Sequence, residues 1–307
     1  MTAETHVLKA LEIDGFDAIP RLLDEFWVNG PNGSHPCSIT EPAFCSLRGC
    51  SLDHLFPLDV ARALAYELAL AVAHMHTRGY AHGDLYLQNM LIRAWSTFNK
   101  LSIQQLYERV SEPIIYPVER TDGKPLPPGI PRNVIVLRLL GGKPSYKFIL
   151  SDARILLNDF REAFIPANQL RLGAKCYTLP LFGTFNGCPD SIVYQVIDTL
   201  GPLPDKWWEK WEKRTKFFKD DGTPKAGRRP LSNLNQRFEE SVQRYRRKLR
   251  MGEYSTEETA AILDLIGRML KLKPEERISI DEVLRSEWIM NWARPDYYRS
   301  LGARLET

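Results

Sequence analysis

A histidine, an aspartate and an asparagine lie close together in residues 82–89, which read HGDLYLQN. Loops that transfer phosphoryl groups carry these residue types at this spacing. In such loops the aspartate accepts the proton of the attacking hydroxyl, and the asparagine five positions later holds a magnesium ion. Asp84 is therefore a candidate catalytic residue, and Asn89 a candidate for both catalysis and metal binding.

A second acidic residue follows an apolar stretch at 149–157, which predicts a buried strand running into Asp159 and Phe160. A strand that delivers an aspartate to magnesium, with a phenylalanine packed beneath it, is typical of phosphotransferases. Asp159 is thus the second candidate metal ligand, with Asn89. Either short motif occurs by chance in loops and cores, but the two in this order are a stronger signal.

Composition limits the classes of protein that this chain can represent. Its 307 residues, 44% of them hydrophobic, are enough for one large domain or two lobes without disulfides. The net charge of +3 is too small to indicate nucleic acid, and no apolar run suits a membrane helix or a signal sequence. We expect no direct nucleic-acid partner and no membrane association. The five cysteines include no CxxC pair, so neither a disulfide framework nor a zinc site is predicted.

The pattern of apolar residues predicts the elements that position these side chains. A helix is expected to end at Leu11, strands at 19–28 and 37–40 flank the turn-rich GPNGS, and a helix bounded by proline and glycine spans 57–79. Proline and glycine are frequent between Asn89 and Asp159, which predicts an insert with loops. Helices are expected after Leu181, at 189–200, in the tryptophan-rich PDKWWEKWEKR, and at 231–250, 256–272 and 280–284.

Several local motifs resemble the SR-protein-specific kinases of the CMGC group of serine/threonine protein kinases. ETHVLKAL resembles the end of the kinase C helix, and GPNGSHPCSITE the strands that lead to the hinge. LGPLPDKWWEKWEKRTKFF and LKPEERISIDEVLRSEWI resemble later parts of the large lobe. The resemblance implies an α+β fold, an incomplete two-lobed kinase with a mainly helical large lobe. Residues 1–46 would be a remnant of the small lobe and residues 47–307 the large lobe, with an insert at about 93–147 and a deletion near 181–182.

The resemblance also implies cofactors, acceptors and further site residues. ATP and Mg2+ would be the cofactors, and serine or threonine hydroxyls of arginine-serine-rich proteins the acceptors. Glu4 would be the C-helix glutamate and Thr40 the gatekeeper, and Glu41, Pro42 and Ala43 would offer their backbone to adenine. The family's distribution implies cytoplasm and nucleus, and the oligomeric state stays open.

The departures from the family pattern predict weak or absent phosphoryl transfer. The chain is expected to begin at the C helix, so no glycine-rich loop precedes Glu4 and no strand supplies a lysine to pair with it. Tyr86 stands where a lysine is usual and brings no positive charge. Arg161 replaces a glycine beside the metal-binding aspartate. Loss of the substrate-binding segment near 181–182 would leave a buried Arg277 without its glutamate and would expose apolar surface.

Two other functions remain open from the sequence. The HGDLxxxN motif with a later DF pair also resembles small-molecule phosphotransferases of the aminoglycoside and choline kinase kind. A pseudokinase that acts as a binding or scaffold module is the other alternative. The arginine cluster at 244–250 would then be a docking face, although such runs are more often solvated, and Trp207, Trp208 and Trp211 are predicted to be core anchors.

Overall fold

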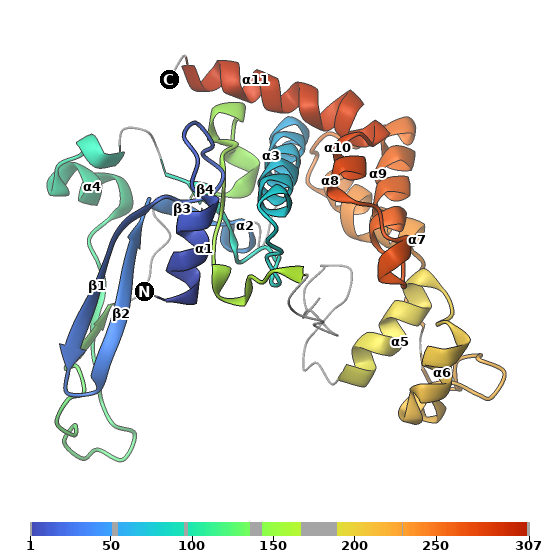
Figure 1. Ribbon diagram of the computed structural model, residues 1–307, viewed down its shortest axis with the longest axis horizontal. Coiled ribbons are helices and arrows are strands. Elements are labelled where there is room, and N and C mark those ends of the chain that lie inside the picture. Colours follow the sequence, from blue (N-terminus) through green and yellow to red (C-terminus); the bar gives the residue numbers. More distant parts are fainter. Residues whose placement is uncertain are drawn as a thin grey trace. The chain divides into compact units, whose positions relative to one another are not determined.

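The computed structural model describes residues 2–50, 55–94, 98–135, 143–166, 189–228 and 230–305 of a mixed α+β protein (Figure 1). The chain divides into two compact units, Met1–Ala174 with Tyr297–Thr307, and Lys175–Asp296. The division after residue 46 that the sequence suggested stays a prediction. The expected deletion near 181–182 lies outside the described residues.

The first unit opens with helix α1 (Ala3–Leu11) and a long hairpin of β1 (Leu22–Gly30) and β2 (Gly33–Thr40). The Thr2 hydroxyl caps α1 by accepting from the Thr5 N–H at 3.1 Å. The hairpin register pairs Gly30 with Gly33, so the turn is shorter than the sequence suggested and β2 begins earlier. Gly33 has φ of 118°, a conformation that favours glycine.

A small antiparallel sheet forms the centre of the first unit, in the order β3 (Ala43–Ser46), β4 (Met90–Arg93), β7 (Ile155–Leu157). Helix α2 (Leu47–Cys50) directly follows β3. Helix α3 (Leu58–Thr77) packs near β7 and buries residues at helical spacing, which confirms the predicted helix. The core of this unit joins α1, the sheet and α3 through fully buried side chains: Leu11, Val60, Met75, Ile92, Ile155, Leu157 and Phe160.

The strand before Asp159 is shorter than the sequence predicted. Residues Leu150–Asp152 form a 3-10 turn, η3, and only Ile155–Leu157 are extended. The Asp152 carboxylate accepts from the Ile149 N–H at 2.8 Å, and this local bond favours a turn over a strand. The apolar run at 149–157 is therefore divided between the turn η3 and the strand β7.

The segment between β4 and β7 has its own short elements. They are η1 (Phe98–Lys100), α4 (Ile103–Val110), the hairpin of β5 (Ile115–Pro117) and β6 (Asn133–Ile135), and η2 (Ser145–Lys147). Ser102 caps α4 by accepting from the Gln105 N–H. The described residues between Asn89 and Asp159 thus combine short regular elements with loops, and the insert itself stays a prediction.

The second unit consists of short helices. It contains α5 (Pro189–Leu200), α6 (Asp205–Lys210), η6 (Glu212–Lys216), α7 (Leu234–Phe238), the π-helical η7 (Glu239–Gln243), α8 (Arg244–Lys248), α9 (Thr256–Met269), η8 (Pro274–Glu276), α10 (Ile280–Leu284) and η9 (Ile289–Ala293). Helices α5 and α10 have the predicted bounds. No helix in the described part of the chain is both long and apolar enough to cross a membrane.

Two predictions for the second unit were partly wrong. Trp208 and Trp211 pack against Phe217 and Phe218 but are only half-buried, and Trp207 is 43% exposed. The arginine cluster at 244–250 is not one uniform face, because Arg246 is only 2% exposed and donates to the Gly252 carbonyl at 3.1 Å. Helix periodicity does not reveal such an inward arginine when a backbone carbonyl is its partner.

The sequence did not predict helix α11 (Arg294–Leu305), which is polar and lacks an apolar stripe. Within the first unit, Arg304 on this helix pairs with the buried Glu67 of α3 at 3.2 Å and donates to the Ala153 carbonyl. Burial raises the pKa of Glu67 in spite of the nearby guanidinium. The last helix is therefore joined to α3 by a buried ion pair.

Candidate functional site

The loop at 82–89 lies between two fixed elements of the first unit. Helix α3 ends at Thr77, and Gly79, with φ of 78°, turns the chain toward the loop. Ala81 and Phe164 form an antiparallel bridge, with N–H to carbonyl distances of 2.8 and 2.9 Å. At its other end the loop continues into β4 after Asn89. Both ends are therefore held by backbone hydrogen bonds.

Asn89 and Asp84, the two residues predicted from their spacing, are brought into contact. The Asn89 amide nitrogen donates to the Asp84 backbone carbonyl at 3.1 Å and to Asp84 Oδ2 at 3.3 Å. Asn89 is 5% exposed, whereas Asp84 is half-buried. The buried amide thus orients the more accessible carboxylate, which a general base must present to its substrate.

His82 links this loop to the segment that carries Asp159. Its Nδ1 accepts from the Asp84 N–H at 3.3 Å, and its Nε2 lies 3.0 Å from the Asn158 carbonyl oxygen. These partners require a neutral ring with the proton on Nε2. Burial lowers the pKa of His82, while the Asn158 carbonyl, Asp84 and Asp159 oppose that shift. Both carboxylates therefore lie within electrostatic reach of one buried imidazole.

Gly83 is required by the way the two segments approach each other. Its φ is +79°, and a Cβ at this position would overlap the carbonyl oxygen of Glu162 and lie 3.2 Å from its carbonyl carbon. A side chain here would have to separate the loop from the segment after Asp159. The sequence motif showed a glycine, but only the structure shows what it touches.

Asp159 lies at the same end of the sheet as Asn89. Because β4 and β7 are antiparallel, Met90 pairs with Leu157, and the Asn158 N–H donates to the Asn89 carbonyl at 2.8 Å. Asp159 itself has a left-handed backbone, with φ of 66° and ψ of 72°. Strand pairing therefore places the backbone of Asn89 beside that of Asn158, next to Asp159, and metal binding by Asn89 and Asp159 stays a prediction.

The Asp159 carboxylate is held by Arg161 in a two-pronged ion pair. Arg161 Nε lies 2.8 Å from Oδ1, and Arg161 Nη2 lies 3.0 Å from Oδ2. Hydrogen bonding and charge from Arg161 lower the pKa of Asp159. The Arg161 side chain is 72% exposed, so solvent surrounds the outer side of the pair. Both oxygens that would coordinate a metal thus already have a cationic partner.

Glu4 has a partner that the sequence did not predict. Its Oε1 accepts from the Phe160 N–H at 3.2 Å, so helix α1 contacts the 3-10 turn η4 (Phe160–Glu162). The sequence predicted only that no lysine would pair with Glu4, and it did not reveal this backbone partner. The Phe160 ring is 1% exposed and lies 5.2 Å from the His82 ring, which completes the packing beneath Asp159.

Thr40 ends β2, Ala43 begins β3, and Glu41 and Pro42 connect the two strands. The Glu41 carboxylate pairs with Arg93 and, at 3.3 Å, with Arg21. The Pro42 carbonyl accepts from the Ala94 N–H at 3.2 Å. These contacts attach the connection to the end of β4 that is remote from Asn89, where Arg93 lies about 14 Å from Asn89 along the strand at ~3.4 Å per residue. The Glu41 carboxylate and the Pro42 carbonyl thus stabilise the fold through these contacts. Contact of this segment with adenine stays a prediction.

The described residues do not fit a bound Mg2+ ion in the observed arrangement. Arg161 holds both oxygens of Asp159, and Asn89 directs its amide nitrogen at Asp84. No three histidine, cysteine, aspartate or glutamate side chains within the described ranges are grouped as a metal site requires. The arrangement presents an oriented base, Asp84, beside a neutralised carboxylate, Asp159.

Arg277 differs from its sequence expectation. It is exposed rather than buried, and it donates from Nε to the Lys271 carbonyl at 2.8 Å and from Nη2 to the Leu272 carbonyl at 3.2 Å. Solvent and backbone carbonyls therefore satisfy the guanidinium without a glutamate. The sequence also missed Asn158, whose contribution is a backbone carbonyl and amide, because backbone groups leave no residue-type signal.

Comparisons with known proteins support a kinase-like relation. Two curated serine/threonine protein kinases, from two strains of Aspergillus fumigatus, are each 26% identical to this chain over 102 residues. The matched stretch is 31% of this chain and 25% of each relative, so the match spans about a quarter of the relatives' length. No family model matches the chain. The similarity supports a relation to serine/threonine protein kinases in general, and the SR-protein-specific and CMGC assignments stay predictions.

Proposed function

We propose that this chain is a serine/threonine-kinase-like protein whose phosphoryl transfer is weak, because Arg161 neutralises the aspartate that would bind magnesium. The acceptor class is serine or threonine in arginine-serine-rich proteins, and the donor is ATP with Mg2+. The acceptor and the donor rest on the motif resemblance. So do the two-lobed kinase fold and a distribution between cytoplasm and nucleus. The observation that carries the proposal is the ion pair between Arg161 and Asp159.

The geometry of the catalytic loop supports the kinase-like part of the proposal. Asp84 is half-buried and is oriented by the buried Asn89 at 3.3 Å. His82 fixes the loop to the carbonyl before Asp159 at 3.0 Å. A carboxylate held in this way could accept a proton from a serine hydroxyl. The loop therefore retains the arrangement of a general base.

The contacts of Asp159 support the weakness of the reaction. A guanidinium on both carboxylate oxygens must leave before a cation can coordinate them, and the Arg161 charge repels that cation. In phosphoryl transfer the protein contributes mainly positioning and charge neutralisation, so a lost charge partner typically lowers the rate by about a hundred- to a thousandfold. Tyr86 adds no cation to compensate.

The test measures transfer of labelled γ-phosphate from ATP to an arginine-serine peptide. We expect slow transfer by the native chain, faster transfer by Arg161→Gly, and none when Asp84→Asn is added to either protein. Nucleotide affinity measured with and without Mg2+ is a second readout, and only Arg161→Gly should gain a magnesium-dependent increase. Arg120→Gly is the matched control. Arg120 forms the same two-pronged ion pair with Asp122, from Nε to Oδ1 at 2.7 Å and from Nη2 to Oδ2 at 2.6 Å, and it lies far from the loop in the sequence.

Fast turnover by the native chain, abolished by Asp84→Asn, would refute weak transfer. Equal magnesium dependence of the native chain and Arg161→Gly would refute the role of Arg161. Phosphorylation of choline or an aminoglycoside, but never of the peptide, would favour a small-molecule phosphotransferase.

A kinase-derived binding module is the second candidate, and the same ion pair favours it. Bound Mg2+ would be unnecessary for such a module, and a neutralised Asp159 would not impair it. If the Arg161→Gly variant binds no magnesium–nucleotide complex and transfers no phosphate, the result would favour a binding module over a weakly active kinase.

A further inference from the structure

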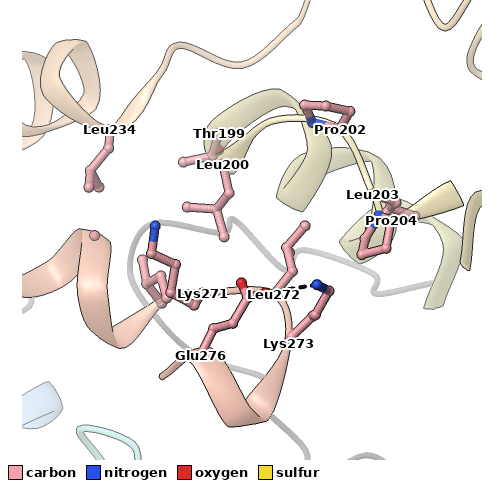
Figure 2. A pocket seen from close by; sticks show the side chains of 12 residues that line it. Thr199, Leu200, Pro202, Leu203, Pro204, Leu234, Lys271, Leu272, Lys273 and Glu276 are labelled. Atoms are coloured by element: carbon pink, nitrogen blue, oxygen red, sulfur yellow. Dashed lines mark hydrogen bonds and ion pairs between the residues drawn. The ribbon is translucent and has the colours of Figure 1, made fainter. Parts of the chain in front are cut away.

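An open apolar groove of about 450 Å³ lies in the unit formed by Lys175–Asp296, and it shares no residue with the loop at 82–89. One wall is α5, and the other walls are α6 and the segment that follows α9. Leu203, in the turn after α5, and Leu272, in the segment after α9, are two of the side chains that line it (Figure 2). The other apolar side chains of the lining are Ile192, Val193, Val196, Trp207 and Trp211.

The apolar side chains of this groove follow helical spacing on two elements. Ile192 and Val196 are at positions i and i+4 of α5, so they lie on one face of that helix. Trp207 and Trp211 have the same spacing on α6 and the residue after it. None of the four is buried, and Trp207 is 43% exposed. Two exposed apolar stripes on separate helices form the type of groove that holds the apolar face of a third helix.

Both charged side chains in the lining of the groove are cationic. They are Lys210 and Arg277, and no carboxylate lines the groove in the part of the chain that the structure describes. Arg277 is fixed in place, because its Nε and Nη2 donate to two preceding backbone carbonyls at 2.8 and 3.2 Å. The adjacent Glu276 pairs with Lys273 at 2.8 Å (Figure 2), so it does not compensate the charge of Arg277. The rim of the groove is therefore positive.

We propose that this groove docks an acidic amphipathic helix of a partner protein. The partner's aliphatic side chains would pack between the stripe on α5 and the two tryptophans, and its carboxylates would face Lys210 and Arg277. A guanidinium that is already held by backbone carbonyls loses little rotamer freedom when it binds a carboxylate. The segment around the tryptophans, 205–228, carries more lysine and arginine than aspartate and glutamate, so its field attracts an acidic partner and opposes a basic one.

The test measures binding of a labelled acidic peptide, acetyl-EELAELLEELAE-amide, to the full chain by fluorescence anisotropy without ATP. Its leucines recur at helical spacing, and its charged side chains are all glutamates. We expect a dissociation constant in the micromolar range, which should rise as salt increases from about 0.05 M to about 0.5 M, because salt screens exposed ion pairs. A peptide with lysine in place of every glutamate should not bind, and neither should one with alanine in place of every leucine.

Two groups of variants test the apolar and the charged part of the groove. Trp207 is exposed, so Trp207→Ala should fold, and it should weaken binding at least about tenfold, as loss of an aromatic anchor does. Lys210→Gln and Arg277→Gln should each weaken it about two- to fivefold, the usual size for an exposed ion pair. Lys248→Gln is the matched control, because Lys248 is an exposed lysine on α8 that does not line the groove. Circular dichroism verifies that each variant is folded.

Failure of the acidic peptide to bind at concentrations up to about 0.1 mM would overturn the proposal. Equal binding of the lysine peptide, unchanged affinity in Trp207→Ala, or equal losses in Lys210→Gln and Lys248→Gln would overturn it as well. Dimerisation of the chain alone in analytical ultracentrifugation, abolished by Trp207→Ala, would mean that a second copy occupies the groove and not an acidic partner. Phosphoryl transfer enters none of these measurements, so a failure here leaves the proposed function standing.

Discussion

At the scale of single residues, the candidate site depends on a glycine and a histidine as much as on its carboxylates. Gly83 permits the loop to approach the Glu162 carbonyl, and His82 connects Asp84 to Asn158 through a neutral ring. Neither residue is needed to accept the proton of a substrate. Their function is to place Asp84 and Asp159 in fixed positions.

Replacement of Gly83 by alanine should destabilise the protein more than the same replacement at Gly79. Both residues have φ near +79°, but an added Cβ meets nothing within 4 Å at Gly79 and overlaps backbone at Gly83. We expect a loss in free energy of unfolding of about 1 kcal/mol at Gly79. At Gly83 a further ~1–3 kcal/mol should be lost. Urea denaturation of both variants checks this, and equal losses would contradict the contact with Glu162.

The stability contribution of His82 should decrease as the solution becomes more acidic. Burial lowers its pKa in the folded protein below the unfolded value of about 6.5. The unfolded chain then binds a proton that the folded chain does not, so the contribution is present above the unfolded pKa and is lost as pH falls. The difference in unfolding free energy between the native chain and His82→Gln should shrink from pH 7.5 to about pH 5.5. A constant or growing difference would refute a neutral, buried ring.

At the scale of elements, strand pairing and one late helix determine the first unit. Antiparallel pairing of β4 with β7 brings Asn89 next to Asn158, although 69 positions separate them, since 158 − 89 = 69. Helix α11 adds Arg304, which contacts Glu67 across most of the sequence. The pairing of β4 with β7 follows from predictable strands, whereas the contact of Arg304 with Glu67 is known only from the tertiary structure.

Arg304→Met should cost about 3–5 kcal/mol of unfolding free energy, because it removes the ion-pair partner of the buried Glu67 carboxylate. The pKa of Glu67 is already raised, and it should rise further in the variant. Because its pKa is raised by folding, Glu67 contributes stability at pH values below its unfolded pKa. This contribution is lost as the pH rises through its folded pKa. The deficit of Arg304→Met relative to the native chain should therefore shrink as the solution is acidified.

Two variants control this experiment. Adding Glu67→Gln to Arg304→Met should recover much of the lost stability, since the uncompensated charge is then absent. Arg268→Met removes an exposed pair with Asp264, at 3.8 Å, and should cost no more than ~1 kcal/mol. A similar loss from Arg268→Met and Arg304→Met would show that burial of the pair is unimportant.

At the scale of the whole molecule, the candidate site lies within one unit. The loop at 82–89 and Asp159 belong to Met1–Ala174 with Tyr297–Thr307. The chain returns to the first unit at its end, so neither unit boundary was predictable from composition.

The amino-acid sequence by itself predicted the elements with regular periodicity and the residue types of the catalytic loop. Helix α3, the hairpin of β1 and β2, α5 and α10 followed from apolar spacing and from proline and glycine at their ends. The proximity of Asp84, Asn89 and Asp159 was a prediction from motif order. These features are local, and local spacing is what a sequence displays directly.

Only the tertiary structure decided which partners these residues have. Arg161 was seen in sequence beside Asp159, but its fork on both oxygens, the bond of Glu4 to the Phe160 N–H and the exposure of Arg277 depend on side-chain and backbone geometry. The pair of Arg304 with Glu67 depends on packing between distant segments. Residue types do not encode such contacts, because each polar group takes whichever partner the folded backbone places within reach.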